Sequence, residues 1–289
     1  MWCLRPILAA PHDVASRQPV LHATMPSVRF APTPVSRRIG VGALLLVAAA
    51  LALALALHGP VVQWAGYHLF ADARSWLGIP NAENVLSNLP FALIGMWGWR
   101  VHARSNSERR RAWCAFAVAL VGTALGSAWY HWAPGNGALV FDRLPIAWAC
   151  ALLACTLLAE RVDARWVDAQ TLTAALVLAT ASVATWWLSE GEGKGDLRAY
   201  LFVQFLPMLL APAAILLRLP ARDPQVLRAQ DWWCVLGLYA TAKLAELADQ
   251  PLLHAVGFTS GHTLKHLLAA AAALWLLRAA AREPADQLR

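Results

Sequence analysis

Long unbroken runs of apolar residues constrain this chain more than any other feature. The run Ile39–Leu57 holds no charged residue and has about the length that a helix needs to cross the hydrocarbon core of a bilayer. Short linkers that carry charged residues separate it from seven further runs. These are Asn84–Arg100, Ala112–Trp132, Asp142–Ala159, Thr171–Leu188, Tyr200–Leu217, Trp232–Leu247 and His262–Leu277. The pattern predicts an all-α integral membrane protein, a bundle of seven transmembrane helices plus one extra N-terminal transmembrane helix.

The composition excludes an ordinary soluble domain. Only 14% of the 289 residues are charged and 59% are hydrophobic, whereas a soluble domain carries about 25% charged residues. The net charge of +7 does not indicate a nucleic-acid partner, because the arginines cluster in linkers between apolar runs. There they are better explained by membrane topology.

The runs divide the chain into four parts. Residues 1–36 are rich in Pro, Ser and Arg, which predicts a disordered N-terminal arm. Residues 37–58 form the extra helix, which we expect to be retained because its apolar run is long for a signal peptide. Residues 72–280 form the seven-helix domain, and residues 281–289 a tail.

The arginine bias predicts the orientation of the helices. Five arginines lie between positions 100 and 111, and the N-terminal arm, the other linkers of that side and the tail also hold arginines. The opposite linkers hold only Arg74, Arg143, Lys194 and Arg198. By the positive-inside rule, both termini and the tail are expected to be cytoplasmic.

Histidines at helical spacing mark the candidate site. Ser127 and His131 are four residues apart, as are His262 and His266, so each pair shares one helix face. Asp142 begins the next run after His131. With the topology above, all five residues lie near the non-cytoplasmic face, although more than a hundred positions separate the two pairs.

Three neutral imidazoles leave one position of a tetrahedral zinc ion open for water, which is the arrangement of a catalytic zinc site. Two other interpretations exist. The histidines could be ordinary hydrogen-bonded helix contacts, although ionisable groups inside membranes are costly and usually functional. A haem site would also use histidines, but it favours facing helices over a pair four residues apart on one helix.

Further polar residues are weaker candidates. Ser87 and Asn88 could orient a metal ligand, or could take part in helix–helix hydrogen bonding beside a cap formed by Asn84. Glu246 or Asp249 could brace a histidine, or Glu246 could simply neutralise Lys243. We expect Lys265, which lies between the two late histidines, to point elsewhere on the helix, where it could snorkel to the interface or pair with an acid.

Together these residues resemble the alkaline ceramidase family, part of a superfamily of seven-helix membrane hydrolases that includes adiponectin-type receptors and GPI-lipid remodelling proteins. The resemblance rests on the order Ser127, His131, Asp142 and the late His262-xxx-His266, with Asn84-Val85-Leu86-Ser87-Asn88 at the first core helix. It covers about residues 72–280. It implies zinc on the three histidines and catalytic assistance from Ser127 and Asp142.

The predicted function is that of a zinc-dependent amidohydrolase that cleaves a ceramide-like lipid to a sphingoid base and a fatty acid. The alternative is a zinc-containing seven-helix receptor or lipid-binding protein without turnover. The stretch from Asp72 to Glu83 has few acids, which argues against the calcium site of animal ceramidases. The expected location is a bacterial inner membrane, because the chain has no long loops, although a Golgi or ER membrane would give the same hydropathy.

Overall fold

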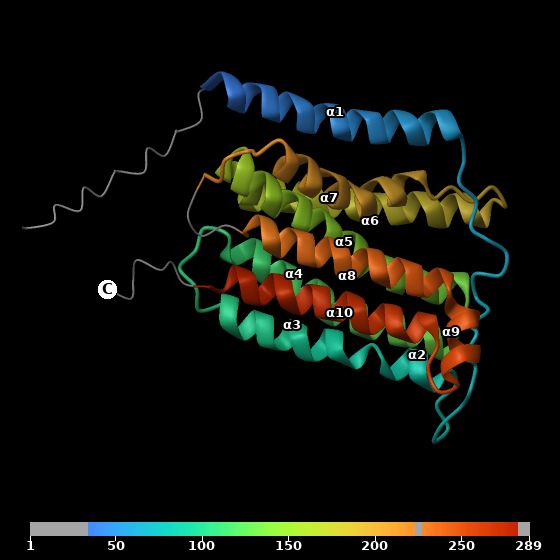
Figure 1. The fold of residues 1–289 in the computed structure, drawn as a ribbon. Helices are drawn as coiled ribbons and strands as arrows, with labels where there is room; N and C mark the ends of the chain where they lie inside the picture. Colours follow the sequence, from blue (N-terminus) through green and yellow to red (C-terminus); the bar gives the residue numbers. More distant parts are fainter. Residues whose placement is uncertain (1–33, 223–226, 283–289) are drawn as a thin grey trace, which may run out of the picture. The chain divides into compact units, whose positions relative to one another are not determined.

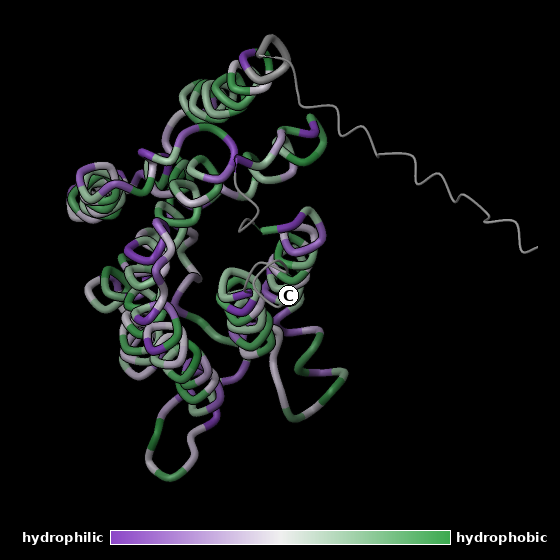
Figure 2. The backbone as a smooth tube through the Cα atoms, turned by 90° about the vertical axis from the view of Figure 1, so that its left-hand side faces the viewer, coloured by the Kyte–Doolittle hydropathy of each residue, from purple (hydrophilic) through white to green (hydrophobic). Residues whose placement is uncertain are grey.

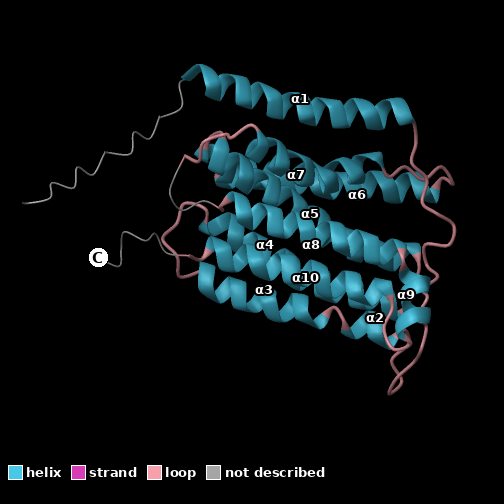
Figure 3. Cartoon of the chain, in the orientation of Figure 1, coloured by secondary structure: helices cyan, strands magenta, loops and turns pink. Residues whose placement is uncertain are grey.

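The computed structural model describes residues 34–222 and 227–282. Residues 1–33 of the expected arm and 283–289 of the expected tail lie outside the described residues. Every regular element in the described part is helical, and its one β-bridge joins Trp76 to Ile79. Figure 3 shows the helices and the loops that join them. The protein is therefore all-α, as the apolar runs predict.

Long helices run alongside one another and alternate in direction (Figure 1). They are α1 (Pro34–His58), α3 (Leu89–His102), α4 (Arg110–Trp132), α5 (Asn136–Arg161), α6 (Ala169–Gly191), α7 (Arg198–Leu216), α8 (Ala229–Leu247) and α10 (Gly261–Ala280). Short elements join them: α2 (Ala82–Leu86), η1 (Ala164–Val167) and α9 (Asp249–Val256). We call the end where α4 ends and α5 and α10 begin the site end, and the opposite end the far end.

Six of the described helices are long and apolar enough to cross a membrane: α1, α4, α5, α6, α7 and α10. Hydrophobic residues predominate along the helices in Figure 2. The protein is therefore an integral membrane protein. Two further expected spans differ from these six. Helix α3 has only 14 residues, and α8 carries Asp231, Lys243 and Glu246.

The expected span Asn84–Arg100 is not one continuous helix. It is divided into α2 and α3, with Ser87 and Asn88 at the break. Pro90 lies two residues after Asn88, and its ring and missing N–H disfavour a continuous helix through the preceding turn. Ser87 and Asn88 therefore lie between the two helices rather than within one, and both residues are buried.

Two glycines let helices approach closely beside the candidate site. A Cβ atom at Gly126 would collide with the carbonyl oxygen of Phe141, where α4 meets α5. A Cβ at Gly261 would collide with the carbonyl oxygen of Ala245, where α10 meets α8. Each glycine directly precedes a predicted site residue, Ser127 or His262, so the close crossings bring these side chains to neighbouring helices.

Candidate metal centre and active site

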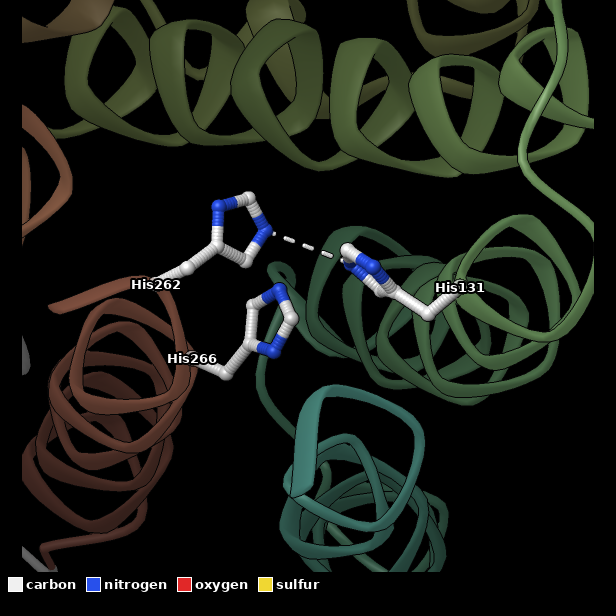
Figure 4. A group of neighbouring side chains, drawn as sticks. All are labelled: His131, His262 and His266. Carbon is white, nitrogen blue, oxygen red and sulfur yellow. Dashed lines mark hydrogen bonds between the residues drawn. The ribbon is translucent and has the colours of Figure 1, made fainter. Parts of the chain in front are cut away.

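Three histidines from two helices meet at the site end. His131 is the second-last residue of α4, and His262 and His266 lie in the first two turns of α10. One ligand atom from each lies within 4.8 Å of the others. The Nε2 atoms of His131 and His262 are 3.3 Å apart, and the three rings face one another (Figure 4). This cluster could hold a metal ion, because three imidazole nitrogens surround one small volume.

Ser87 determines which nitrogen of His266 faces the cluster. Its hydroxyl donates to the carbonyl oxygen of Asn84 at 3.0 Å. The hydroxyl has no second proton, so its oxygen accepts from Nδ1 of His266, 2.7 Å away. With Nδ1 protonated, Nε2 of His266 keeps a free lone pair, which is the form that a metal ligand requires.

Buried surroundings hold His131 in place. The residue is 1% exposed, and its carbonyl oxygen accepts from the side-chain amide of Asn81 at 2.8 Å. Phe70, in the loop between α1 and α2, packs against His131 and His262 with ring centroids 4.6 and 5.2 Å away. Nδ1 of His131 has no hydrogen-bond partner among the described residues. Loop and helix together shield the cluster.

Asp249 positions His262 through the backbone rather than the ring. Its Oδ1 accepts from the backbone N–H of His262 at 2.7 Å, and its Oδ2 accepts from the N–H of Ala71 at 3.0 Å. Ser260 accepts from the N–H of Thr263 at 3.2 Å, so two of the first N–H groups of α10 are satisfied. Asp249 therefore joins the start of α10 to the loop that carries Phe70.

Asn84 is not a helix cap, since the residue before α2 is Asn81. The side chain of Asn84 is fully buried. It donates to the carbonyl oxygen of Asp72 at 3.1 Å and accepts from the hydroxyl of Thr263 at 3.1 Å. It therefore links the α1–α2 loop to α10. Asn88 donates to the carbonyl oxygen of Asn84 at 2.8 Å, and its Oδ1 has no partner among the described residues.

Ser127 and Asp142 lie together, as the spacing predicts. The Ser127 hydroxyl hydrogen-bonds the Asp142 carboxylate across the α4–α5 crossing at Gly126. Ser127, Asp142 and His266 line one cavity of about 320 Å³. The carboxylate thus faces the same cavity as His266 of the histidine cluster.

Lys265 pairs with an acid, which was one of the expected alternatives, but the expectation that it points away from the histidines was wrong. Its ammonium lies 3.0 Å from Nε2 of His262 and 2.9 Å from Oε1 of Glu246. Glu246 also pairs with Lys243 at 2.5 Å. Glu246 therefore reaches the cluster only through Lys265. The long lysine side chain bends toward the carboxylate of a neighbouring helix, a direction that spacing along one helix does not reveal.

The stretch from Asp72 to Glu83, which has few acids, contains the positively charged side chain of Arg74. The Arg74 guanidinium pairs with Asp72 at 2.7 Å and Glu83 at 3.2 Å, and donates to the carbonyl oxygens of Gly257 and Phe258. The hydrogen bond from Arg74 lowers the pKa of Asp72 below its usual value. In the described structure, these oxygen atoms surround an arginine.

The cavity has two different ends. Toward the site end, its wall holds Asn88, Ser127, Asp142, Arg143, Glu246 and Lys265. Toward the far end, the wall is apolar and includes Phe116, Leu153, Val235, Ala273 and Leu276. The cavity therefore has a polar end beside His266 and an apolar end among the long helices.

A family model for ceramidases matches residues 79–242, more than half of the chain. The chain belongs to the ceramidase family. This confirms the resemblance that the sequence motifs indicate, and ceramidase membership implies hydrolysis of an amide bond in a lipid such as ceramide. No curated protein matches the chain.

The ceramidase match includes Ser87, Asn88, Ser127, His131 and Asp142. His262 and His266 lie beyond the matched residues, so the fold alone brings them to His131. Sequence reasoning missed Phe70, Asn81, Asn84 and Lys265 as parts of the cluster's surroundings. Of these four, only Lys265 has a sequence signal for such a role, because it lies between His262 and His266.

Proposed function

We propose that this ceramidase-family protein is a zinc-dependent hydrolase that cleaves the amide bond of a ceramide-like lipid to a sphingoid base and a fatty acid. One observation carries the proposal. The three converging imidazoles and the Ser127–Asp142 pair adjoin the polar end of a cavity whose other end is apolar. Metal ligands, an acid–base group and a lipid-sized apolar space occur together.

The cluster suits zinc by its donor atoms. Zinc accepts imidazole nitrogens in sites with three protein ligands and one open position. Ser87 leaves Nε2 of His266 unprotonated, and Nε2 of His131 faces Nε2 of His262. Lys265 contacts the His262 lone pair, but Glu246 offers its ammonium a second partner at 2.9 Å. The ion would thus be held by His131, His262 and His266.

The neighbouring residues would perform the proton transfers. A bound zinc ion supplies Lewis acidity and the activation of water near neutral pH. The Asp142 carboxylate would accept a proton from the attacking water and deliver it to the nitrogen of the leaving amine. The Ser127 hydroxyl holds this carboxylate and can turn to donate to the carbonyl oxygen as negative charge develops there. Phe70 would limit access of bulk water to the histidines.

Topology supports a location for the site. We propose that residues 72–280 form a seven-helix catalytic domain, that α1 is the retained extra helix, and that the site end faces the non-cytoplasmic side of a bacterial inner membrane. The support is the arginine bias, with five arginines between positions 100 and 111 at the far end. A reporter fused after residue 282 is expected to report a cytoplasmic position.

Release of fatty acid from labelled ceramide by the purified protein tests the proposed activity. The His262→Ala variant is expected to lose fatty acid release, because the cluster loses a ligand. His254→Ala is the matched control, because His254 is an exposed histidine on α9, and it is expected to keep full activity. Failure of the wild type to release fatty acid from every amide and ester lipid tested would contradict the proposal and favour a lipid-binding protein without turnover.

A further inference from the structure

Arg143 is a buried cation in the cavity wall that the proposed reaction does not use. It follows Asp142 on α5, and only 3% of its surface is exposed. Its Nε and Nη1 atoms have no hydrogen-bond partner among the described residues. Buried polar groups are nearly always paired, and a buried charge without a partner is costly. Such a group in the wall of a cavity indicates that a ligand supplies the partner.

Aromatic rings hold the Arg143 guanidinium without neutralising it. The guanidinium carbon lies 4.0 Å from the ring centroid of Trp186, 5.1 Å from Tyr67 and 5.4 Å from Tyr200. Attraction to ring faces stabilises a cation but provides no acceptor for its N–H groups. A stacked guanidinium donates in its own plane and matches a carboxylate or phosphate with two parallel bonds.

The nearby carboxylates have other partners. Asp142 is adjacent in sequence, but neighbouring residues on a helix do not face each other, and its carboxylate bonds Ser127. Glu246 pairs with both Lys243 and Lys265. Three cationic side chains and two carboxylates line the cavity. The cavity therefore has one more positive charge than its own acids balance, and no carboxylate among the described residues hydrogen-bonds Nε or Nη1 of Arg143.

Arg143 lies where the head of a bound lipid would lie. Tyr67 precedes α2 in the site-end loop, and Tyr200 is in the first turn of α7, so both ring partners belong to the site end. Asp142, which would protonate the leaving amine, is the preceding residue. A lipid with its chain toward the far end and its amide beside Asp142 would bring its head group near the guanidinium.

We propose that Arg143 is a specificity-determining residue that binds an acidic group, a phosphate or a carboxylate, in the head of an N-acyl lipid substrate. This inference rests on the proposed function and narrows its substrate class. The protein prefers N-acyl lipids with an anionic head to neutral ceramide, and the Arg143 guanidinium in the cavity wall accounts for the preference.

Two matched substrate pairs test this preference in the wild-type protein. Ceramide 1-phosphate and ceramide differ only in the phosphate, and N-palmitoylglycine and N-palmitoylethanolamine differ in a carboxylate. A charge-assisted bond to a buried guanidinium predicts a kcat/KM about 10-fold or more higher for the anionic member of at least one pair. The pair that shows the difference identifies the acid. Equal or better hydrolysis of the neutral member in both pairs would overturn the inference and leave the proposed function intact.

Variants assign the preference to Arg143. Arg143→Gln is expected to bring the ratio of kcat/KM for the anionic lipid to kcat/KM for its neutral counterpart close to one, chiefly through a higher KM for the anionic lipid. Arg143→Lys keeps the charge but loses the paired donors, so an intermediate ratio is expected. Lys194→Gln removes an exposed positive charge in the α6–α7 loop and serves as the control. If Arg143→Gln kept the wild-type ratio of kcat/KM between anionic and neutral lipids, Arg143 would not be the residue that determines the preference.

If no lipid is hydrolysed, the proposed function fails, and binding decides the inference separately. Dodecyl phosphate and dodecanoate, but not dodecanol, should then raise the thermal unfolding midpoint of the wild type, and the rise should vanish in Arg143→Gln. The Arg143→Gln protein can lose the aromatic stacking and unfold more easily, which is why the wild-type comparison is the primary test. No preference for either anion over dodecanol in the wild type would overturn the inference.

Discussion

The two ends of the cavity are built by different parts of the chain. At the site end, segments outside the long helices support the polar side chains. The α1–α2 loop provides Phe70 and Asn81, and the α2–α3 break provides Ser87. The short helix α9 provides Asp249, which accepts from the backbone N–H of His262. At the far end, long helices alone line the cavity with residues such as Phe116 and Leu276. Changes at the site end should alter metal binding and chemistry, whereas changes at the far end should alter chain-length preference.

Outside the three histidines, the largest effect is expected from Asp142→Asn. The amide keeps the volume and much of the hydrogen bonding to Ser127 but cannot carry the proton from water to the leaving nitrogen. A fall in kcat of roughly 10²–10⁴-fold is expected, as for the loss of a general base. Metal content should stay at the wild-type level, measured on the same purified sample. Loss of metal together with activity would show that Asp142 supports the cluster rather than the chemistry.

A smaller effect is expected from Ser87→Ala. Without its acceptor oxygen, Nδ1 of His266 no longer has a fixed proton, and the ring loses its orientation. Loss of such a support typically lowers metal affinity by about 10–100-fold, which competition with a chelator measures. Ser182→Ala is the matched control, because Ser182 is also buried but bonds only the carbonyl oxygen of Ala179 in its own helix. Equal affinities in the two variants would contradict the role of Ser87.

At the far end, Leu276→Phe should shorten the space for the lipid chain. Leu276 is buried and lines the cavity, and a larger side chain there costs about 1–3 kcal/mol where it overpacks. The KM for long-chain amides should rise several-fold, while that for short-chain amides and the metal content remain unchanged. A uniform loss across all chain lengths would remove the distinction between the two ends.

The smallest effect is expected from Asp72→Asn, which tests the loop at the site end. Arg74 is half-exposed, so the lost ion pair is worth about 1 kcal/mol or less. Because the folded-state pKa of Asp72 lies below its usual 3.8, its stabilisation is present above that value and is lost as the pH falls through the lowered pKa. Thermal unfolding at pH 7 should therefore separate the variant from wild type, and the difference should shrink below pH 4. If the unfolding midpoints of Asp72→Asn and wild type differed by the same amount at all pH values, the difference would not come from the ionised Asp72 carboxylate.

Helix-level features of the site could be predicted from the sequence. The spacing of four residues places Ser127 beside His131 and His262 beside His266 on their helix faces, and alternating topology puts both pairs at one depth. The break at Ser87 was not predicted, although Pro90 stands in the printed sequence, because an apolar run by itself does not reveal where a helix is interrupted.

Contacts between helices could not be predicted in the same way. The direction of the Lys265 side chain depends on Glu246 of α8, which approaches only because Gly261 allows a close crossing. His102 at the end of α3 is buried, stacks on Trp113 of α4 and bonds the carbonyl oxygen of Leu277 in α10. These partners belong to other helices, and only packing reveals them.

The metal content of the purified protein tests the central claim most directly. Elemental analysis should find about one zinc ion per chain in the wild type and in His254→Ala, and none in a variant with His131, His262 and His266 all changed to alanine. Removal of zinc by a chelator should abolish lipid hydrolysis, and added zinc should restore it. A zinc-free wild type that hydrolyses ceramide, or zinc retained by the triple variant, would contradict the assignment of this cluster as the metal centre.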